Sequence, residues 1–322
     1  MLSLLRRSSN AFETLAVEGL SADWHLPSDA VWIDLFNPSR DEEVAVEKSV
    51  GLDLPTAEEM AQIEPSSRLY QEGGATFMTA SLLVRSDSDM PVLSPVTFVL
   101  NEQRLITIRY EEAKAFTTFA QRALLNPSEV PSGAEGLMGL LDAIIERLAE
   151  ALERGSEQVQ ASSVAIFNRP HGAAFEPLLT GLARTQSTAS LARTSLVSLG
   201  RLASFAALAP QVSERTPVQA HLTSIQHDVQ SLTDHSSYQA THIAFLLDAA
   251  LGLINIEQNN TMKFFALATV LLMPPTLVGA IYGMNFEHMP ELKWLHGYPF
   301  ALGLMVISGL APFLWFRRKR WL

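Results

Sequence analysis

Polar and polarizable side chains recur on one face of an apolar segment near the end of the chain. In a bundle of helices, such a face would line a narrow pore in which apolar rings dehydrate an ion and hydroxyls contact it. Ordinary packing between membrane helices also favours small residues and threonines, so the pattern leaves both interpretations open. At helical spacing the residues of this face are Asn259, Met262, Thr269, Met273, Thr276 and Ala280, with Phe265 beside them.

The connector that follows this segment carries a second group of candidates. It runs from Gly283 to Gly297, and Glu287 and Glu291 within it are the only acids after Glu257. A ring of carboxylates at the mouth of a pore would concentrate cations there.

A third candidate lies further upstream, where His227-Asp228 and Asp234-His235 stand seven residues apart and His242 continues the row. On a helix, Asp228, His235 and His242 lie close to one face. The functional interpretation is a divalent-ion site between neighbouring helices, and the alternative is a solvated polar stripe. The acid-rich stretch from 142 to 157 also contains arginines, and it is typical of a solvated helix face.

The sequence offers no catalytic constellation. It has no P-loop, no G-x-G-x-x-G after a strand, no G-x-S-x-G and no H-E-x-x-H. The absence of cysteine excludes disulfides, thiolate zinc sites and cysteine nucleophiles. We therefore expect neither an enzyme nor a bound cofactor. With 34 acids against 23 Lys and Arg, the net charge of −11 also argues against nucleic-acid binding.

Two apolar runs without a charged residue, 264–282 and 298–316, dominate the end of the chain. About 20 apolar residues span the hydrocarbon core of a bilayer, so the runs predict a membrane hairpin rather than two buried core helices. The basic ending Arg317-Arg-Lys-Arg320 predicts that the C-terminus is cytoplasmic, and two spans place the N-terminal body on the same side. No signal peptide is expected, because no long apolar region follows Arg7.

The remaining sequence predicts a mixed α/β body followed by long helices. Strands are expected at 30–36, 75–85, 96–100 and 105–109, a helix start at Ser39, and a helix at 112–125. From 134 onward only helical spacing remains, and one pattern begins near 216 and, after Pro217 in its first turn, meets no proline until Pro274, which with Pro275 should kink the span. A helix longer than 60 residues is best explained as a stalk. The expected segments are an α/β domain at 1–130, a helical hairpin at 131–212, the stalk at 213–263, the first span at 264–282, a connector at 283–297, the second span at 298–316 and a basic tail at 317–322.

Directly after the first span, Gly283-Met284-Asn285 and the segment Phe286–Leu292 closely resemble the CorA family of magnesium transporters. A rare tripeptide occurs here in the context that the family requires, between two terminal spans. The similarity also covers Ile254–Asn259, Pro274–Val278, Gly297–Pro299, the ending Trp321-Leu322 and, near the N-terminus, Trp32–Leu35.

The resemblance implies a homopentamer in the cell inner membrane, with a cytoplasmic α/β/α funnel and a stalk helix that continues into the pore-lining span. Gly283, Met284 and Asn285 would form the selectivity filter, in which a ring of Asn285 amides hydrogen-bonds the water shell of the ion. Mg²⁺ gives up its octahedral waters reluctantly, so such a ring can recognise the hydrated ion. Met262, Phe265, Met273 and Thr276 match positions that line or gate the pore.

The resemblance further implies that Mg²⁺ is both the substrate and a regulatory ligand that holds the funnel closed. Where some members carry a sensing aspartate on the stalk, the nearest residue here is Ser224, and Asp228 is a candidate. The membrane potential would drive influx, gaining about 4.6 kcal/mol per 100 mV for two charges. Co²⁺ and Ni²⁺ would be secondary substrates of a transporter of the magnesium type. The alternatives are a zinc transporter of the ZntB kind and a cytoplasmic enzyme or signalling protein anchored by the hairpin.

Overall fold

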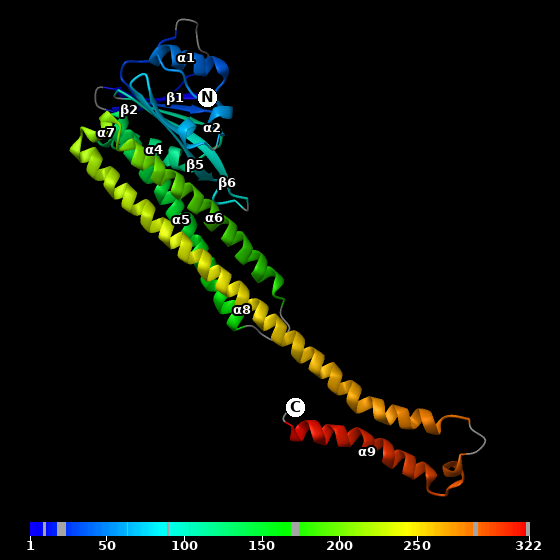
Figure 1. The fold of residues 1–322 in the computed structure, drawn as a ribbon. Coiled ribbons are helices and arrows are strands. Elements are labelled where there is room, and N and C mark those ends of the chain that lie inside the picture. The colour runs from blue at the N-terminus through cyan, green and yellow to red at the C-terminus, as the bar shows by residue number, and fades with distance from the viewer. Residues whose placement is uncertain are drawn as a thin grey trace. The chain divides into compact units, whose positions relative to one another are not determined.

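The computed structural model describes residues 1–322 except 9–10, 18–23, 63, 89, 103, 169–173, 286–288 and 320–322. The chain divides into two compact units, Met1–Leu247 and Asp248–Leu322. Helix α8 (Thr216–Tyr282) contributes its first part to one unit and its last part to the other (Figure 1). This division is coarser than the seven segments expected from the sequence.

The first unit is built on a mixed β-sheet. In the described part of the chain its order is β2-β1-β3-β7-β6-β5-β4, and β3 and β7 form the parallel pair while the other neighbours are antiparallel. The strands are β1 (Leu2–Ser8), β2 (Ala11–Val17), β3 (Ala30–Phe36), β4 (Leu69–Glu72), β5 (Ala75–Val84), β6 (Val92–Asn101) and β7 (Arg104–Arg109).

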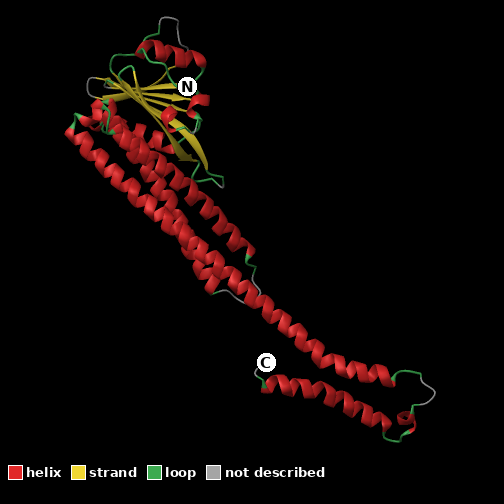
Figure 2. Cartoon of the chain, viewed as in Figure 1, coloured by secondary structure: helices red, strands yellow, loops and turns green. Residues whose placement is uncertain are grey.

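Each face of the sheet has its own apolar core, because successive side chains of a strand point to opposite faces. Ile33 and Phe77 pack on the face covered by α1 (Arg40–Val50) and α2 (Ala57–Met60), whereas their neighbours Trp32 and Met78 pack on the opposite face. That opposite face is covered by α4 (Lys114–Leu125), α5 (Gly133–Phe167) and α6 (Glu176–Ala206) (Figure 2). The unit is therefore an α/β/α sandwich. Its short connecting helices are α3 (Pro65–Arg68), η1 (Pro127–Glu129) and α7 (Pro210–Ser213).

Helices α5, α6 and the first part of α8 pack side by side. Ser236 of α8 donates its hydroxyl to the carbonyl of Ala189 on α6 at 3.0 Å. Gln239 of α8 donates its amide to the carbonyl of Leu152 on α5 at 3.2 Å. Both side chains are buried, so these hydrogen bonds fix the register of α8 against its two neighbours.

Helix α6 protects an open sheet edge. β4 pairs only with Ala75–Met78, so among the described residues the second half of β5 has no strand on the side that faces away from β6. There the backbone N–H groups of Ser81 and Leu83 donate to the hydroxyls of Ser198 and Ser195 on α6, at 2.9 and 3.2 Å. Helix cover of this kind prevents the edge from pairing with another chain.

A buried polar network joins the central parallel strands. Asp34 on β3 accepts from Arg109 on β7, with its Oδ2 at 2.8 Å from Nη2 and both carboxylate oxygens at 3.2 Å from Nε. Thr107 donates to Asp34 at 2.7 Å and accepts from the Trp32 indole at 3.0 Å. Every charged group in the network has a partner, which is the condition for burying an ion pair in a sheet. The ring of Phe36 lies 4.4 Å from the guanidinium and adds a cation–π contact.

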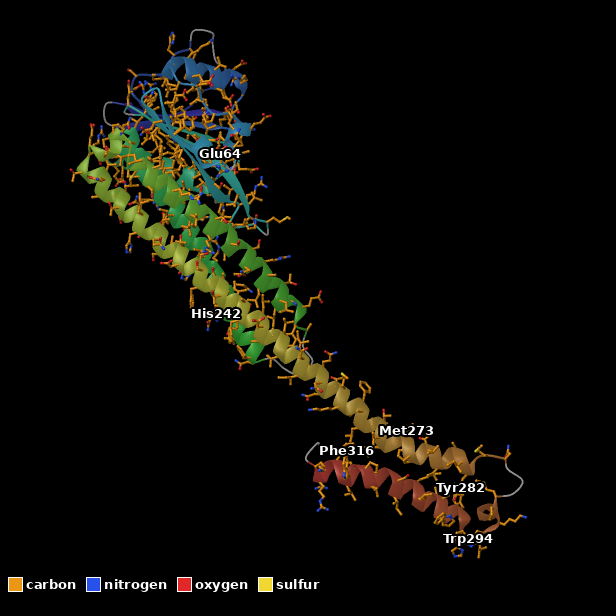
Figure 3. The ribbon with its side chains drawn as sticks, viewed as in Figure 1. Glu64, His242, Met273, Tyr282, Trp294 and Phe316 are labelled. Atoms are coloured by element: carbon orange, nitrogen blue, oxygen red, sulfur yellow. The ribbon has the colours of Figure 1, made fainter. Side chains whose placement is uncertain are left out.

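The second unit contains the end of α8, the turn η2 (Pro290–Lys293) and α9 (Gly297–Arg318). Both helices include a stretch that is long and apolar enough to cross a membrane. Gly309 of α9 allows close packing, because a Cβ there would lie 3.3 Å from the Pro275 ring and 3.4 Å from the Leu271 carbonyl. Tyr282 and Trp294 lie near one end of this hairpin and Phe316 near the other, as expected for aromatic interfacial belts (Figure 3).

Most of the sequence-predicted elements are confirmed. The strand at 30–36 has the predicted bounds, and Ser39 begins α1 with a capping box to Glu42. The long pattern from residue 216 is one helix that ends at Tyr282. The sequence-based interpretation missed β1, β2 and β4.

Candidate functional site

The face of α8 that was predicted to line a pore is exposed. We call its residues the polar stripe: Asn259, Met262, Phe265, Thr269, Met273, Thr276 and Ala280. All seven are exposed in the single chain, and Met273 keeps 69% of its surface. Leu271, Pro275 and Gly279, spaced by four residues, form the face that packs on α9. Met273 lies two residues, more than half a turn, from the first two of these, so the polar stripe points away from α9.

The two stripe hydroxyls have a fixed orientation. Thr269 donates its hydroxyl proton to the Phe265 carbonyl at 2.9 Å, and Thr276 donates to the Leu272 carbonyl at 2.6 Å. A hydroxyl that donates its proton to a helix carbonyl keeps its oxygen lone pairs free to accept from other partners. Both threonines therefore present acceptors on the exposed face, which suits a cation or the hydrogens of its water shell.

The middle of the apolar stretch of α8 contains two successive prolines. Pro274 and Pro275 cannot donate to the carbonyls of Val270 and Leu271, which lose their helical partners. The Thr276 hydroxyl bond falls in the same turn, and both features bend helices. The polar stripe therefore crosses a turn of α8 that lacks two backbone hydrogen bonds and is easier to bend than the rest of the helix.

The tripeptide Gly283-Met284-Asn285 directly follows α8. The N–H of Gly283 donates to the Gly279 carbonyl at 2.9 Å, and the N–H of Met284 donates to the Ile281 carbonyl at 3.2 Å, so the last turn tightens. Asn285 comes directly after this turn and is exposed. Within the described residues its carboxamide has no hydrogen-bond partner, and it remains available to a ligand.

The structure does not describe the side chains of the two connector acids, Glu287 and Glu291. Glu287 lies outside the described residues. Glu291 lies in η2, where the backbone is described but the side chain is not.

The row of acids and histidines on α8 does not form a metal site within one chain. Asp234 accepts from Gln230 at 3.0 Å, and His235 Nε2 lies 3.2 Å from the Ser156 hydroxyl of α5. Asp228 and Ser224 are exposed. Among the described residues, no three carboxylate or imidazole groups gather so that they could hold a metal ion. A divalent site between helices of neighbouring chains stays a prediction.

Comparison with known proteins identifies the family. The family described as "CorA-like Mg2+ transporter protein" matches residues 27–318. The chain belongs to this CorA-like family. It is 34% identical over 322 residues to the magnesium transport proteins CorA of Salmonella typhimurium and Escherichia coli K12, and the similarity covers 100% of each chain. The fold matches the complete structure of the CorA magnesium transporter from Methanocaldococcus jannaschii, with a TM-score of 0.79 and 18% identity, over 100% of this chain and 99% of the other.

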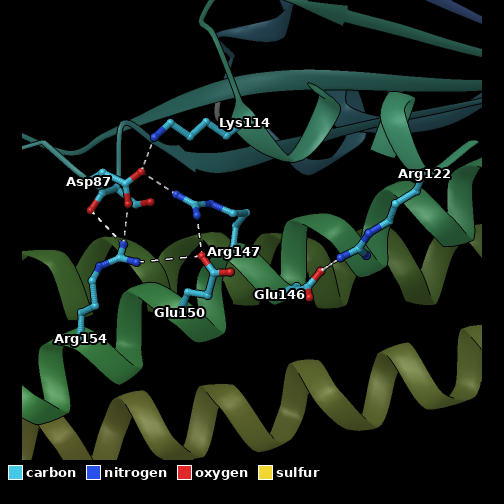
Figure 4. Close-up of polar contacts among 8 residues, drawn as sticks. Asp87, Lys114, Arg122, Glu146, Arg147, Glu150 and Arg154 are labelled. Atoms are coloured by element: carbon cyan, nitrogen blue, oxygen red, sulfur yellow. Dashed lines mark hydrogen bonds and ion pairs between the residues drawn. The ribbon is translucent and has the colours of Figure 1, made fainter. Parts of the chain in front are cut away.

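In this CorA-like chain the acid-rich stretch of α5 is occupied by ion pairs. Asp87, in the turn between β5 and β6, accepts from Lys114 at 2.6 Å, from Arg147 at 2.7 Å and from Arg154 at 2.8 Å (Figure 4). Arg147 also binds Glu150 at 2.5 Å. One carboxylate thereby joins the β5–β6 turn to α4 and α5. Lys114, followed by the charge of Arg147, holds the pKa of Asp87 below its ordinary value despite the opposing effect of burial.

Other acids of the same stretch are also paired. Glu146 binds Arg122 of α4 at 2.6 Å, and Asp142 lies 2.7 Å from His221 of α8. The sequence-based interpretation as a solvated face described the partial exposure of these groups but missed their partners. Asp87 stands in a turn some 60 residues before Arg147, and no local spacing connects the two.

Proposed function

We propose that the chain mediates influx of hydrated Mg²⁺ through a pore lined by the polar stripe of α8. The observation that carries this proposal is the arrangement of α8 itself: the polar stripe faces away from α9, exposes threonine acceptors, and leads to the exposed amide of Asn285. A helix that served only as an anchor would have no need of acceptors on the face turned away from its neighbour.

The proposed pore requires several copies of the chain. We propose a homopentamer, the assembly that the resemblance to the CorA family implies. One copy leaves the stripe exposed, together with the flanking apolar side chains of Val270, Leu277 and Ile281. Apolar flanks of this kind are suited to contact neighbouring helices, while the stripe they enclose would face a central channel. The proposed partners are thus the chain itself, the lipid bilayer and divalent cations.

Selection would occur at Gly283, Met284 and Asn285. A ring of Asn285 amides and Gly283 carbonyls offers neutral oxygens to the water shell, which favours an ion that dehydrates reluctantly. Glu287 and Glu291 would raise the cation concentration near this ring. Co²⁺ and Ni²⁺, which also form octahedral hexahydrates, would be secondary substrates.

We propose that both ends of the chain lie in the cytoplasm, and the basic residues Arg317, Arg318 and Lys319 near the end of α9 support this orientation. An inside-negative potential then supplies about 4.6 kcal/mol per 100 mV for a divalent ion, without ATP or a second ion. Cytoplasmic Mg²⁺ bound between subunits would close the pore.

A zinc transporter of the ZntB kind is the first alternative. Full-length similarity at 34% identity to proteins named magnesium transport proteins supports Mg²⁺ over Zn²⁺. A hairpin-anchored enzyme or signalling protein is the second alternative, and membership of a transporter family speaks against it.

The test is ion flux into liposomes that contain the purified protein, with an inside-negative potential. Mg²⁺, Co²⁺, Ni²⁺ and Zn²⁺ are compared with and without a pH gradient. Potential-driven Mg²⁺ entry that millimolar cytoplasmic-side Mg²⁺ blocks is the expected result. Zn²⁺ entry that depends on the proton gradient, with little Mg²⁺ flux, would transfer the protein to the zinc alternative.

The filter is tested by Asn285→Ala in the same assay. Loss of the amide ring should reduce Mg²⁺ flux more than tenfold, equivalent to about 1.4 kcal/mol, without lowering the thermal unfolding midpoint, because the side chain has no partner in the described part of the chain. Asn126→Ala is the matched control, since Asn126 is exposed at the end of α4 in the other unit. Unchanged flux in Asn285→Ala would refute the assignment of the filter.

A further inference from the structure

Helix α6 carries a charge pattern opposite to the net charge of the first unit. Residues 177–213 contain no acid, although the chain has 34 acids in 322 residues. The same stretch contains Arg184, Arg193 and Arg201, together with many serines and threonines. An acidic protein thus presents one helix that is basic and rich in hydroxyls.

Two of these arginines line a pocket against the sheet. The pocket has a volume of about 410 Å³ and lies between α6, β5 and the start of β4, where Arg68 adds a third guanidinium. Ser81 of β5 and Ser190 and Thr194 of α6 supply hydroxyls to the same lining. Pockets of roughly 300–1,000 Å³ are typical of small-molecule sites.

The positive charges in this pocket have no acidic partner in the described part of the chain. Among the described residues, neither Arg193 nor Arg201 has an acidic partner. Arg68 donates to the Gln62 carbonyl at 2.5 Å and to the Ser81 hydroxyl at 3.0 Å, both uncharged. Burial, and then the charge of Arg201, lower the pKa of Arg68.

In another cavity of this unit, the lining arginines have acidic partners. In the cavity between the β5–β6 turn and α4, Arg85 binds Glu111 and Arg147 binds Asp87. The contrast indicates that the counter-charge of the α6 pocket comes from outside the chain.

We propose that this pocket binds a multiply charged phosphate group, such as pyrophosphate or the polyphosphate part of a nucleotide. Planar guanidinium groups bind phosphate oxygens through two parallel hydrogen bonds. The Ser81 and Ser190 hydroxyls can donate to the remaining oxygens, whereas Thr194 already donates its proton to the Ser190 carbonyl at 3.0 Å. The three positive charges of these arginines can neutralise a ligand that carries more than one negative phosphate charge. None of the described residues that line the pocket is aromatic, so the phosphate rather than a stacked base is the recognised part. The site belongs to the first unit and is independent of the proposed transport function.

The experiment is isothermal titration calorimetry on the full chain in nanodiscs of neutral phosphatidylcholine, without Mg²⁺. The soluble probes are inorganic phosphate, pyrophosphate and ATP, and the lipid probe is a water-soluble short-chain phosphatidic acid. Pyrophosphate and ATP are expected to bind more tightly than single phosphate. Each lost guanidinium should weaken binding about tenfold or more. The variants are Arg193→Gln, Arg201→Gln and the double substitution.

Arg184→Gln is the matched control. Arg184 lies on the same helix, nine residues or two and a half turns from Arg193, and so on the opposite side. It should bind the probes as the wild type does. The thermal unfolding midpoint, measured with and without pyrophosphate, separates binding from folding. Without ligand, Arg201→Gln should have the same midpoint as the wild type or a higher one, because the substitution removes the repulsion between Arg201 and Arg68. With pyrophosphate, the variant should lack the upward shift of the midpoint that the wild type shows.

Arginine-dependent binding of the soluble phosphates supports a nucleotide-type ligand, and arginine-dependent binding of phosphatidic acid alone supports a phospholipid headgroup as the source. Absence of binding by every probe at millimolar concentration overturns the proposal. Equal binding by the wild type and the double variant also overturns it.

Discussion

The buried ion pair between β3 and β7 allows a quantitative test of the fold. The side chains of Asp34 and Arg109 are only 9% and 10% exposed, and they share three contacts of 2.8 to 3.2 Å. Asp34→Leu leaves the guanidinium buried without its counter-charge, and removing one partner of a buried pair typically costs about 3–5 kcal/mol. Asp34→Leu combined with Arg109→Met removes both charges, and an apolar replacement of a whole pair is often neutral.

The first unit spans 247 residues. For a domain of about this size, 1 kcal/mol shifts the thermal midpoint by about 2–4 °C, so Asp34→Leu should lower it by about 6–20 °C. The assay is thermal unfolding of the full chain at one scan rate, followed by tryptophan fluorescence, since Trp32 belongs to the same network. The double variant should recover most of the loss. A midpoint within 2 °C of the wild type for Asp34→Leu, or a double variant no more stable than the single one, would refute the reasoning.

Three further predictions concern charge and close packing. The lowered pKa of Asp87 means that its carboxylate contributes stability fully above about pH 4, the unfolded value, and that this contribution is lost as pH falls through the lower native pKa. The difference in unfolding midpoint between wild type and Asp87→Asn should therefore shrink from pH 5 to pH 2.5, and a constant difference would contradict the assignment. Gly133→Ala should destabilise the first unit by about 1–3 kcal/mol in the same assay, because the added Cβ would overlap the backbone of Arg104. Gly309→Val should separate α9 from α8 and reduce Mg²⁺ flux, whereas Gly303→Val, which has open space at its Cβ, should conduct normally.

The sequence predicted the elements whose signals are local. The strand at 30–36, the cap at Ser39 and the long helix from residue 216 each depend on neighbours within a few residues. β1 and β2 pair with each other, and β1 also pairs with β3, which lies further along the chain, a contact that the local sequence does not show. β4 had a readable signal that was not used: Gly73-Gly74 between two β-rich runs is typical of a two-residue hairpin, and both glycines have positive φ.

The same distinction applies to the candidate sites. The polar stripe followed from helical spacing alone, and its exposure opposite α9 agrees with that spacing. The pair Asp34–Arg109 and the α6 pocket did not follow, because their members are 75 and more than 100 residues apart. Contacts at that separation depend on strand order and helix docking, which a single sequence does not encode locally.

The distribution of ion pairs also narrows the search for a site that senses cytoplasmic Mg²⁺. Not every acid of the first unit is free to bind a metal ion. Asp142, Glu146 and Glu150 of α5 already contact basic or histidine partners. A Mg²⁺ ion would have to displace these partners before it could bind there. Asp228 on α8 is exposed and, in the described part of the chain, has no partner to displace. Because the described residues of one chain gather no metal site, a carboxylate free in the monomer is the kind of group that a site between copies requires, and we expect that site to use Asp228 rather than the paired acids of α5.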